Sequence, residues 1–342
     1  MEGVRMSTLR PYSLLLPASI PAFVGHEMNI YFDNLIPGDD GNYEFEVVCE
    51  IGRHQNERWT VVPEKEGLYA LTIHLYSLDG ERLASADSTV TVAKRTTENG
   101  PMRKALFIGD STTAAGVFTE ELLHLFDDDP LRLTLIGTQG TSPNVHEGRA
   151  GWKVESHFSM HESAFVIEGN FDFANYMQVN GFSGLNHVGI FLGINDVWHC
   201  KDDSSMQQLM DKEMPMLEEI VRQIRHYDAG IAIGIMLIIP PPRTQDGFGN
   251  SYGTKQTRRR YKRNVWMWNQ ELAGRFGNRH AESIELIPLH VNLDTVHNMP
   301  GVWEEANSRN SKQVWRQNDD VHPTVEGYRQ IADTIYYWLR TL

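Results

Sequence analysis

The chain has 342 residues, of which 41% are hydrophobic and 22% charged, a composition typical of a globular protein with material for about two domains. Its 31 Lys and Arg against 45 Asp and Glu give a formal net charge of −14, which repels the phosphates of nucleic acids and anionic membrane surfaces. The two cysteines, Cys49 and Cys200, lack the spacing of a disulfide framework or a zinc site. We therefore expect no nucleic-acid partner, no membrane partner and no bound metal.

The N-terminal segment places Arg5 and Arg10 before the apolar run YSLLLPASIPAFV. Charges before an apolar run are typical of a signal peptide, but Pro17 and Pro21 interrupt this run and it lacks a good small-residue cleavage site. We therefore predict that the segment forms the first strand of the fold. No stretch approaches the length of a membrane span. A cytoplasmic location follows as the expectation, and secretion would require a signal peptide outside this sequence.

Residues from Arg10 to Thr97 alternate apolar and polar side chains with a period of two, as in NYEFEVVCEI and LYALTIHLYSL. Turn signals such as PGDDGN and LDGER separate the runs. The pattern predicts a small antiparallel β-sandwich over residues 1–97, and its late strands resemble those of immunoglobulin-like domains. The polar residues that follow predict a linker over 98–103 and a second domain over 104–342.

In the second region, apolar runs of strand length alternate with amphipathic runs of helical length. Five runs are predicted strands: ALFIG (105–109), LTLIG (133–137), HVGIFLG (187–193), IAIGIMLII (231–239) and SIELIPL (283–289). Between and after them, apolar residues keep helical spacing, for example from Val325 to Leu339. This alternation predicts an α/β domain with a parallel sheet and helices on both faces.

Polar residues follow the predicted strands where ligands of such sheets bind, outside the carboxyl ends of the strands. Ser111 follows the first strand at the start of a helix, Asn195 follows the third, and QNDDVHPTVEGY places Asp319 and His322 before the last helix. A serine hydroxyl becomes a nucleophile when an imidazole takes its proton and a carboxylate orients that ring. The oxyanion formed on the substrate needs hydrogen-bond donors, and the amides of Ser111, Gly151 and Asn195 are suitable.

These residues resemble the motifs of the SGNH, or GDSL, hydrolase family. Four blocks match in order and in approximate spacing: Gly109-Asp110-Ser111, Gly151, Gly193-Ile194-Asn195-Asp196 and Asp319-x-x-His322. The resemblance covers residues from about 103 to 342. It implies a flavodoxin-like three-layer αβα fold with strand order 2-1-3-4-5, and ester hydrolysis through an acyl-serine intermediate with no cofactor and no metal. By the same resemblance Ser111 is the nucleophile, His322 the base, Asp319 its orienting partner, and Ser111, Gly151 and Asn195 the oxyanion donors.

Several residues near these motifs have two possible roles. Trp152, Trp198, Trp303 and Trp315 lie in or near the motif loops, where aromatic rings could stack on a sugar or shape an acyl pocket. Trp152 and Trp198 are the candidate substrate-binding residues, and core packing is the alternative for all four. Asp110 and Asp196 are expected to hold loops. The basic run TRRRYKRN (257–264) is expected to be a solvated helix face or a source of ion pairs on so acidic a chain.

The sequence therefore predicts a serine esterase of small acyl esters, and the favoured substrate class is acetylated sugars or oligosaccharides. A short-chain carboxylesterase, thioesterase or lysophospholipase is the alternative within the class. A catalytically silent carbohydrate-binding protein is the alternative outside it. The expected partner is the small-molecule or oligosaccharide ester itself, and self-association into a homo-oligomer stays open.

Overall fold

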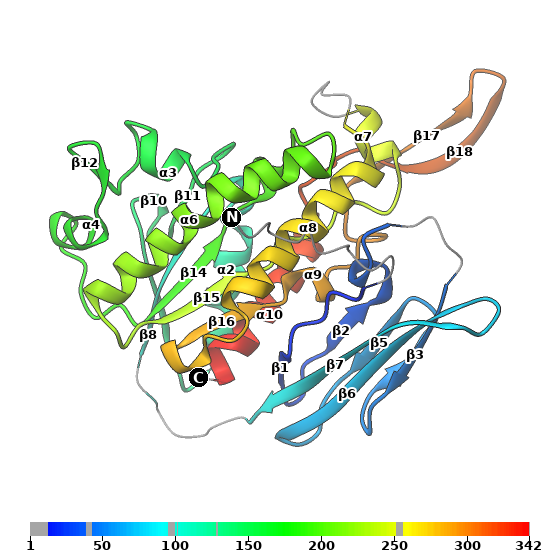
Figure 1. Cartoon of the computed structure of the whole chain (residues 1–342), viewed down its shortest axis with the longest axis horizontal. Coiled ribbons are helices and arrows are strands. Elements are labelled where there is room, and N and C mark those ends of the chain that lie inside the picture. The colour runs from blue at the N-terminus through cyan, green and yellow to red at the C-terminus, as the bar shows by residue number, and fades with distance from the viewer. Residues whose placement is uncertain are drawn as a thin grey trace, which may run out of the picture.

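The computed structural model describes residues 13–38, 43–94, 100, 102–127, 129–250 and 256–341. In this part of the chain two β-sheets come first and a mixed α/β region follows (Figure 1). Parts of two predicted segments lie outside the described residues. These are Arg5 and Arg10, which precede the predicted first strand, and positions 98, 99 and 101 of the predicted linker.

The N-terminal region forms two sheets. A four-stranded sheet has the order β1 (Ser19–Phe23), β7 (Arg82–Ala93), β6 (Gly67–Ser77), β3 (Tyr43–Val48). A three-stranded sheet has the order β2 (Met28–Tyr31), β5 (Arg58–Val61), β4 (Arg53–His54), and the 3-10 helix η1 (Phe32–Leu35) directly follows β2. Alternation along β6 buries Leu71, Ile73 and Leu75, which is why the period of two is visible in the sequence.

The expectation of purely antiparallel pairing is wrong at β1. This strand pairs parallel with β7, with Ile20 opposite Val90, whereas β6 pairs antiparallel with both β3 and β7. A parallel pair needs a long connection, and here β2 to β6 all lie between the two partners in the chain. Side-chain alternation has the same period in both kinds of pair, so the sequence pattern carries no information on strand direction.

The central sheet has seven strands in the order β10-β11-β8-β14-β15-β16, and β9 also pairs with β8. Their bounds are β8 (Arg103–Gly109), β9 (Leu133–Ile136), β10 (Gln139–Thr141), β11 (Asn144–Gly148), β14 (His187–Phe191), β15 (Ala232–Met236) and β16 (Ile284–Ile287). The pairings are parallel except for β10 with β11. The five predicted strands correspond to β8, β9, β14, β15 and β16. Their order across the sheet is 2-1-3-4-5, so the predicted parallel sheet is confirmed.

The longer helices pack in two pairs, α6 (Asp203–Tyr227) with α8 (Arg258–Phe276) and α2 (Val117–Asp127) with α10 (Val325–Thr341). Figure 1 shows the two pairs on opposite sides of the central sheet. The remaining short elements are α1 (Ser111–Ala114), α3 (Ser156–Ser159), β12 (Val166–Ile167), β13 (Asn170–Phe171), α4 (Phe173–Val179), α5 (Ile194–Val197), α7 (Asp246–Asn250), η2 (His280–Glu282), α9 (Leu289–Asn292), β17 (Gly301–Asn307) and β18 (Asn310–Gln317).

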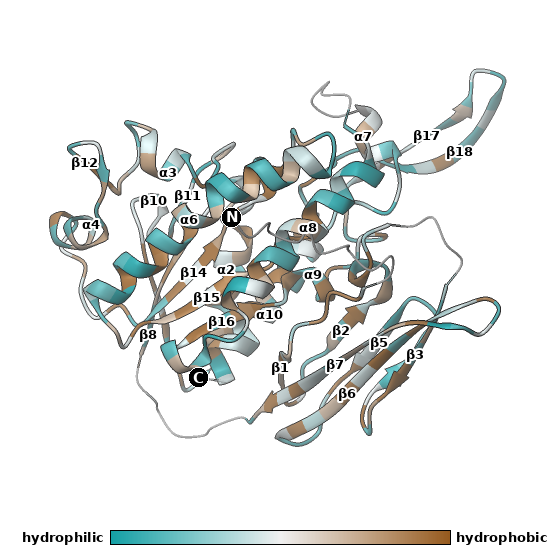
Figure 2. Ribbon diagram, in the orientation of Figure 1, coloured by the Kyte–Doolittle hydropathy of each residue, from teal (hydrophilic) through white to brown (hydrophobic). Residues whose placement is uncertain are grey.

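Hydrophobic residues are frequent along the strands of the central sheet (Figure 2). All five residues of β14 are buried, as expected for a strand that is covered on both faces. In α10 the predicted stripe is buried from Tyr328 to Leu339, and only its first member, Val325, is 49% exposed. Among the described residues, no helix combines the length and the apolar character that crossing a membrane requires.

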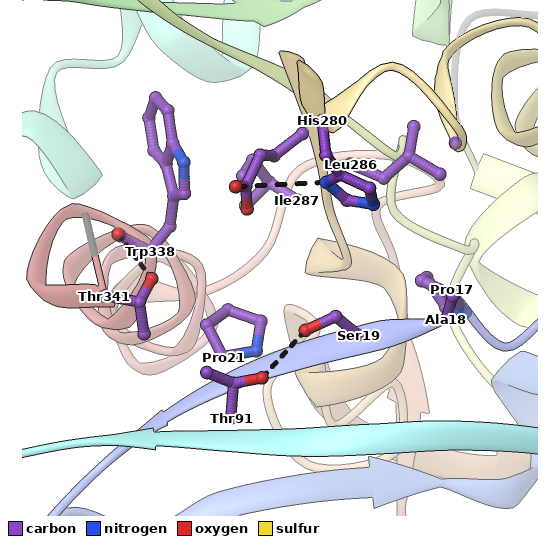
Figure 3. Close-up of a pocket in the computed structure, with 12 residues that line it drawn as sticks. Pro17, Ala18, Ser19, Pro21, Thr91, His280, Leu286, Ile287, Trp338 and Thr341 are labelled. Atoms are coloured by element: carbon purple, nitrogen blue, oxygen red, sulfur yellow. Dashed lines mark hydrogen bonds and ion pairs between the residues drawn. The ribbon is translucent and has the colours of Figure 1, made fainter. Parts of the chain in front are cut away.

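The N-terminal sheets pack directly against the α/β region. The Asn34 side chain donates to the carbonyl oxygens of His290 and Leu293, both at 2.8 Å, and the Asn29 amide donates to Asn292 Oδ1 at 3.0 Å. A pocket of about 220 Å³ also lies at this junction. Figure 3 shows Ser19 and Thr91 on its N-terminal side and Trp338 of α10 on the other. None of the predicted site residues lines this pocket.

Candidate active site

The predicted site residues come from four loops that meet at one edge of the central sheet. Ser111 begins α1 directly after β8, Gly151 follows β11, Asn195 lies in α5 after β14, and His322 precedes α10. The carboxyl ends of neighbouring parallel strands lie at the same edge, which brings the first three loops together. The loops enclose a pocket of about 550 Å³ lined by Ser111, Ala150, Gly151, Asn195, Trp198, His199, Val321 and His322.

Ser111 and His322 are in hydrogen-bonding contact although 211 positions separate them in the chain. The distance from Ser111 Oγ to His322 Nε2 is 3.0 Å. On the other side of the ring, His322 Nδ1 lies 3.4 Å from Asp319 Oδ1. The same carboxylate oxygen accepts the backbone amides of Val321 at 3.0 Å and His322 at 2.8 Å. The carboxylate therefore shapes the loop and orients the ring at the same time.

The pKa values of His322 and Asp319 are shifted in the directions that suit a histidine base beside an ionised carboxylate. The hydrogen bond with Asp319 raises the pKa of His322 above its ordinary value, although partial burial opposes the shift. Burial would raise the pKa of Asp319, but hydrogen bonds from the His322 side chain and from two backbone amides outweigh it and lower that pKa. Asp319 therefore stays ionised beside the ring. The adjacent Asp320 is fully buried, whereas Asp319 Oδ1 lies 3.4 Å from His322 Nδ1, so geometry as well as spacing favours Asp319.

The loop that carries Asp319 is held by a residue that the sequence analysis missed. Gln317, at the end of β18, is buried, and its Oε1 accepts the amide of Thr244 at 2.8 Å. Its Nε2 donates to the carbonyl oxygens of Thr295 at 2.8 Å and Val296 at 3.1 Å. Gln317 thus joins three segments just before Asp319. No motif marks it, because its partners, three backbone groups and the Thr244 hydroxyl, are distant in the sequence.

Three groups of the pocket can donate to an oxyanion. The amide of Ser111 is at the first position of α1, and Gly151 has a φ of +77°, which favours glycine, with open space where a Cβ would lie. Asn195 Nδ2 donates to the carbonyl of Trp152 at 3.0 Å, which fixes the side chain and leaves its second N–H for another acceptor. Gly148, three residues before Gly151, donates its amide to His146 Nδ1 at 3.1 Å and does not line the pocket.

The two aspartates of the motifs hold loops, as expected. Asp110 Oδ1 accepts the Thr112 amide at 2.9 Å and caps α1, and Asp196 Oδ1 accepts the Val154 amide at 3.0 Å. Both side chains are buried and neither lines the pocket. Burial raises the pKa of Asp110 to about 6 and that of Asp196 to about 8. Near neutral pH Asp196 is therefore largely protonated, which lowers the cost of burying it.

The model of the GDSL-like lipase/acylhydrolase family matches residues 107–330. The chain belongs to this family. A comparison with curated protein sequences found no significant match.

Among solved structures, the chain of this GDSL-like hydrolase is similar to a family 3 carbohydrate esterase from Clostridium thermocellum, with 16% identity, coverage of 69% of this chain and 94% of the other, and a TM-score of 0.45. It is similar to a carbohydrate acetylesterase from Sinorhizobium meliloti, with 13% identity, coverage of 69% and 98%, and a TM-score of 0.40. It is also similar to an acetylxylan esterase from Geobacillus stearothermophilus, with 17% identity, coverage of 70% and 94%, and a TM-score of 0.38.

The tryptophans near the motifs of the GDSL-like hydrolase take different positions. Trp198 lines the pocket and stacks on Phe248, with ring centroids 5.8 Å apart and planes at 7°. Trp152 lines an adjoining pocket instead. Trp303 and Trp315 face each other across the β17–β18 hairpin, 66% and 47% exposed, and the hairpin projects from the body of the molecule (Figure 1). The alternative of core packing is therefore wrong for this last pair.

The basic run of residues 257–264 forms ion pairs, as one of its two readings predicted. It opens α8, where Arg260 and Arg263 bind Asp203, and Lys262 Nζ lies 2.8 Å from Asp33 Oδ1. The solvated face is wrong for Lys262, which is buried. Within the described part of the chain, no three His, Cys, Asp or Glu side chains are close enough to hold a metal ion.

Proposed function

We propose that this GDSL-like hydrolase is a serine esterase of small acyl esters, with Ser111 as nucleophile, His322 as base and Asp319 as its orienting partner. The supporting observation is the contact of Ser111 Oγ with His322 Nε2 at 3.0 Å, in a pocket that also contains Gly151 and Asn195. Serine, imidazole, carboxylate and oxyanion donors together form the constellation of acyl transfer.

In the first half of the reaction, Ser111 Oγ attacks the ester carbonyl carbon and its proton moves to His322 Nε2. The ionised Asp319 stabilises the imidazolium, and the amides of Ser111, Gly151 and Asn195 donate to the oxyanion. The bond from carbon to the alcohol oxygen then breaks, and that oxygen takes the proton from Nε2. In the second half, His322 Nε2 removes a proton from water, whose oxygen attacks the acyl carbon. The bond from that carbon to Ser111 Oγ then breaks, Oγ takes the proton back from Nε2, and the carboxylic acid leaves.

The wall of the pocket favours a short acyl group. Trp198 is 9% exposed and contacts Phe248 and Tyr261, so its ring is held in place beside the reacting groups. A held ring limits the room for a long chain. We therefore favour an O-acetylesterase of sugars or oligosaccharides over a thioesterase or lysophospholipase that acts on longer chains.

A panel of aryl esters of increasing acyl length, run beside acetylated xylo-oligosaccharides with acetate quantified, tests this function. We expect release to be fastest from acetyl esters and to fall as the chain lengthens. Fastest release from long chains would support a lipase-like enzyme, and no release from any ester would support the silent carbohydrate-binding protein.

The variant Ser111→Ala provides the control for the nucleophile. It removes one oxygen from a half-buried side chain, so we expect the thermal midpoint to change little while acetate release is abolished. Persistent turnover in this variant would show that another group attacks the ester.

A further inference from the structure

A second pocket adjoins the proposed active site. It has a volume of about 470 Å³, and Ala150 lines both pockets, so they meet at this residue. The pocket of Ser111 offers apolar surface beside its reacting groups, from Ala150, Trp198 and Val321. The second pocket is lined by polar and aromatic side chains, among them Gln139, His146, Arg149, Trp152 and Glu162. The two pockets therefore suit chemically different halves of one ester.

An arginine and a tryptophan form a fixed platform in the second pocket. The Arg149 guanidinium lies 4.9 Å from the centroid of the Trp152 ring. Glu147, which is fully buried, holds this arginine through a contact of 3.4 Å to Nη2. The Glu147 Oε1 in turn accepts the Tyr176 hydroxyl at 3.0 Å and the Thr138 amide at 2.6 Å. Because buried partners hold the platform, little ordering is required when a ligand binds.

The same pocket supplies donors and acceptors around this platform. His146 Nδ1 accepts the Gly148 amide, so the ring proton is assigned to Nε2, and burial lowers the pKa of the ring and keeps it neutral. His146 is therefore a donor. Gln139 provides both a donor and an acceptor, and the exposed Glu162 provides an acceptor. Aromatic surface with donors and acceptors around it is complementary to a ring that carries several hydroxyl groups.

We propose that this second pocket binds the hydroxyl-rich alcohol half of the ester, a sugar residue, while the acyl group occupies the apolar pocket beside Ser111. The inference rests on the proposed esterase function, and it adds which surface recognises the alcohol. An acetyl group needs only the apolar wall at Trp198 and Val321. The shared Ala150 marks the place where the bound ester passes from one pocket to the other.

Two truncations at the rim of the second pocket test this inference in the full chain. Gln139→Ala and Glu162→Ala remove side chains that are half-buried and exposed, so both variants should fold. We measure kcat/KM for acetylated xylotriose and for 4-nitrophenyl acetate, whose flat alcohol lacks hydroxyl groups for these side chains to bind. The ratio of sugar ester to aryl ester is expected to fall about threefold to tenfold in each variant, mainly through KM, as for the loss of one hydrogen bond.

Matched controls carry the same substitutions elsewhere. Gln178→Ala on α4 and Glu64→Ala in the N-terminal region remove exposed side chains that do not line the second pocket, and we expect the ratio of wild type. A further pair tests the platform: Trp152→Leu should lower the ratio, and Trp152→Phe, which keeps an aromatic face, should recover most of it.

The outcomes separate this inference from the proposed function. Rim variants with the same ratio as their controls would overturn the second pocket as the alcohol site. A wild-type enzyme that hydrolyses 4-nitrophenyl acetate but not acetylated xylotriose would overturn it as well, while the esterase assignment would stand. A wild-type protein that hydrolyses neither ester would instead overturn the proposed function.

Discussion

At the scale of single residues, the proposed chemistry depends on one proton and one developing charge. His322 must accept the proton of Ser111, and its contacts with Ser111 Oγ and Asp319 Oδ1 are at 3.0 and 3.4 Å. Asn195 is the one side chain among the proposed oxyanion donors, so it can be removed without altering the backbone. These two residues therefore give the clearest tests of the mechanism.

The first prediction concerns Asn195→Ala. The variant removes one donor to the oxyanion, and turnover of aryl acetates should fall on the order of a hundredfold or more, as for such donors elsewhere. The variant also loses the contact of Asn195 Nδ2 with the Trp152 carbonyl. A thermal melt of the variant monitors that structural loss. A turnover close to that of wild type would remove Asn195 from the oxyanion site.

The second prediction concerns pH. Because Asp319 raises the pKa of His322, kcat/KM should fall on acidification with a midpoint above the ordinary imidazole value of about 6.5. Protonated imidazole cannot accept the serine proton, which sets the direction of the effect. Asp319→Asn removes the main cause of the shift, so the midpoint should move to lower pH. An identical midpoint in both proteins, read from initial rates between about pH 5 and 9, would contradict this assignment.

At the scale of elements, ion pairs join the N-terminal end of α8 to the helix η1. Asp33 Oδ1 lies 2.9 Å from an Arg243 guanidinium nitrogen and 2.8 Å from Lys262 Nζ, and Asp33 Oδ2 lies 3.2 Å from Arg258. The three cations come from the loop after β15 and from the first turns of α8. One carboxylate in the N-terminal region thus contacts three cations of the α/β region, of which Arg258 and Lys262 are buried.

The third prediction is that Asp33→Asn lowers the free energy of unfolding by about 3 kcal/mol, because it removes a carboxylate that contacts two buried cations, Arg258 and Lys262. Burial alone would raise the pKa of Asp33, but Lys262 and the two arginines lower it. The stabilisation is therefore present above the pKa of the unfolded aspartate and is lost as pH falls through the folded one. Denaturant melts at pH 7 and at low pH measure it, with the exposed Asp79→Asn as control. Equal stability of the two variants at pH 7 would contradict the role of Asp33.

At the scale of the whole molecule, the N-terminal sheets and the α/β region share one hydrophobic core. Phe23 of β1 contacts Tyr336 of α10, with ring centroids 5.3 Å apart, and the Tyr337 hydroxyl donates to the Glu27 carbonyl at 2.7 Å. His290 Nε2 lies 3.1 Å from the Leu15 carbonyl. The division into residues 1–97 and 104–342 is still a prediction, and these contacts argue that neither part is independent of the other.

The fourth prediction is that a fragment of residues 104–342 aggregates or loses activity, because removing the N-terminal sheets exposes apolar surface and leaves the polar groups of α9 without partners. Size-exclusion chromatography and hydrolysis of an aryl acetate, each compared with the full chain, measure the outcome. A monomeric, fully active fragment with the thermal midpoint of the full chain would show that the α/β region folds alone.

By itself, the sequence determined five of the seven strands of the central sheet and the residue types of the candidate site, and it missed β10 and β11. Buried parallel strands appear as continuous apolar runs, and short motifs such as Asp319-x-x-His322 keep their partners within a few residues. Only the tertiary structure decided the direction of β1, the exposure of the Trp303 and Trp315 hairpin, and the contacts of Gln317 and Asp33. Strand direction, exposure and contacts between distant segments depend on which segments pack together in the folded chain. The periodicity of side chains along one segment carries no information on that packing.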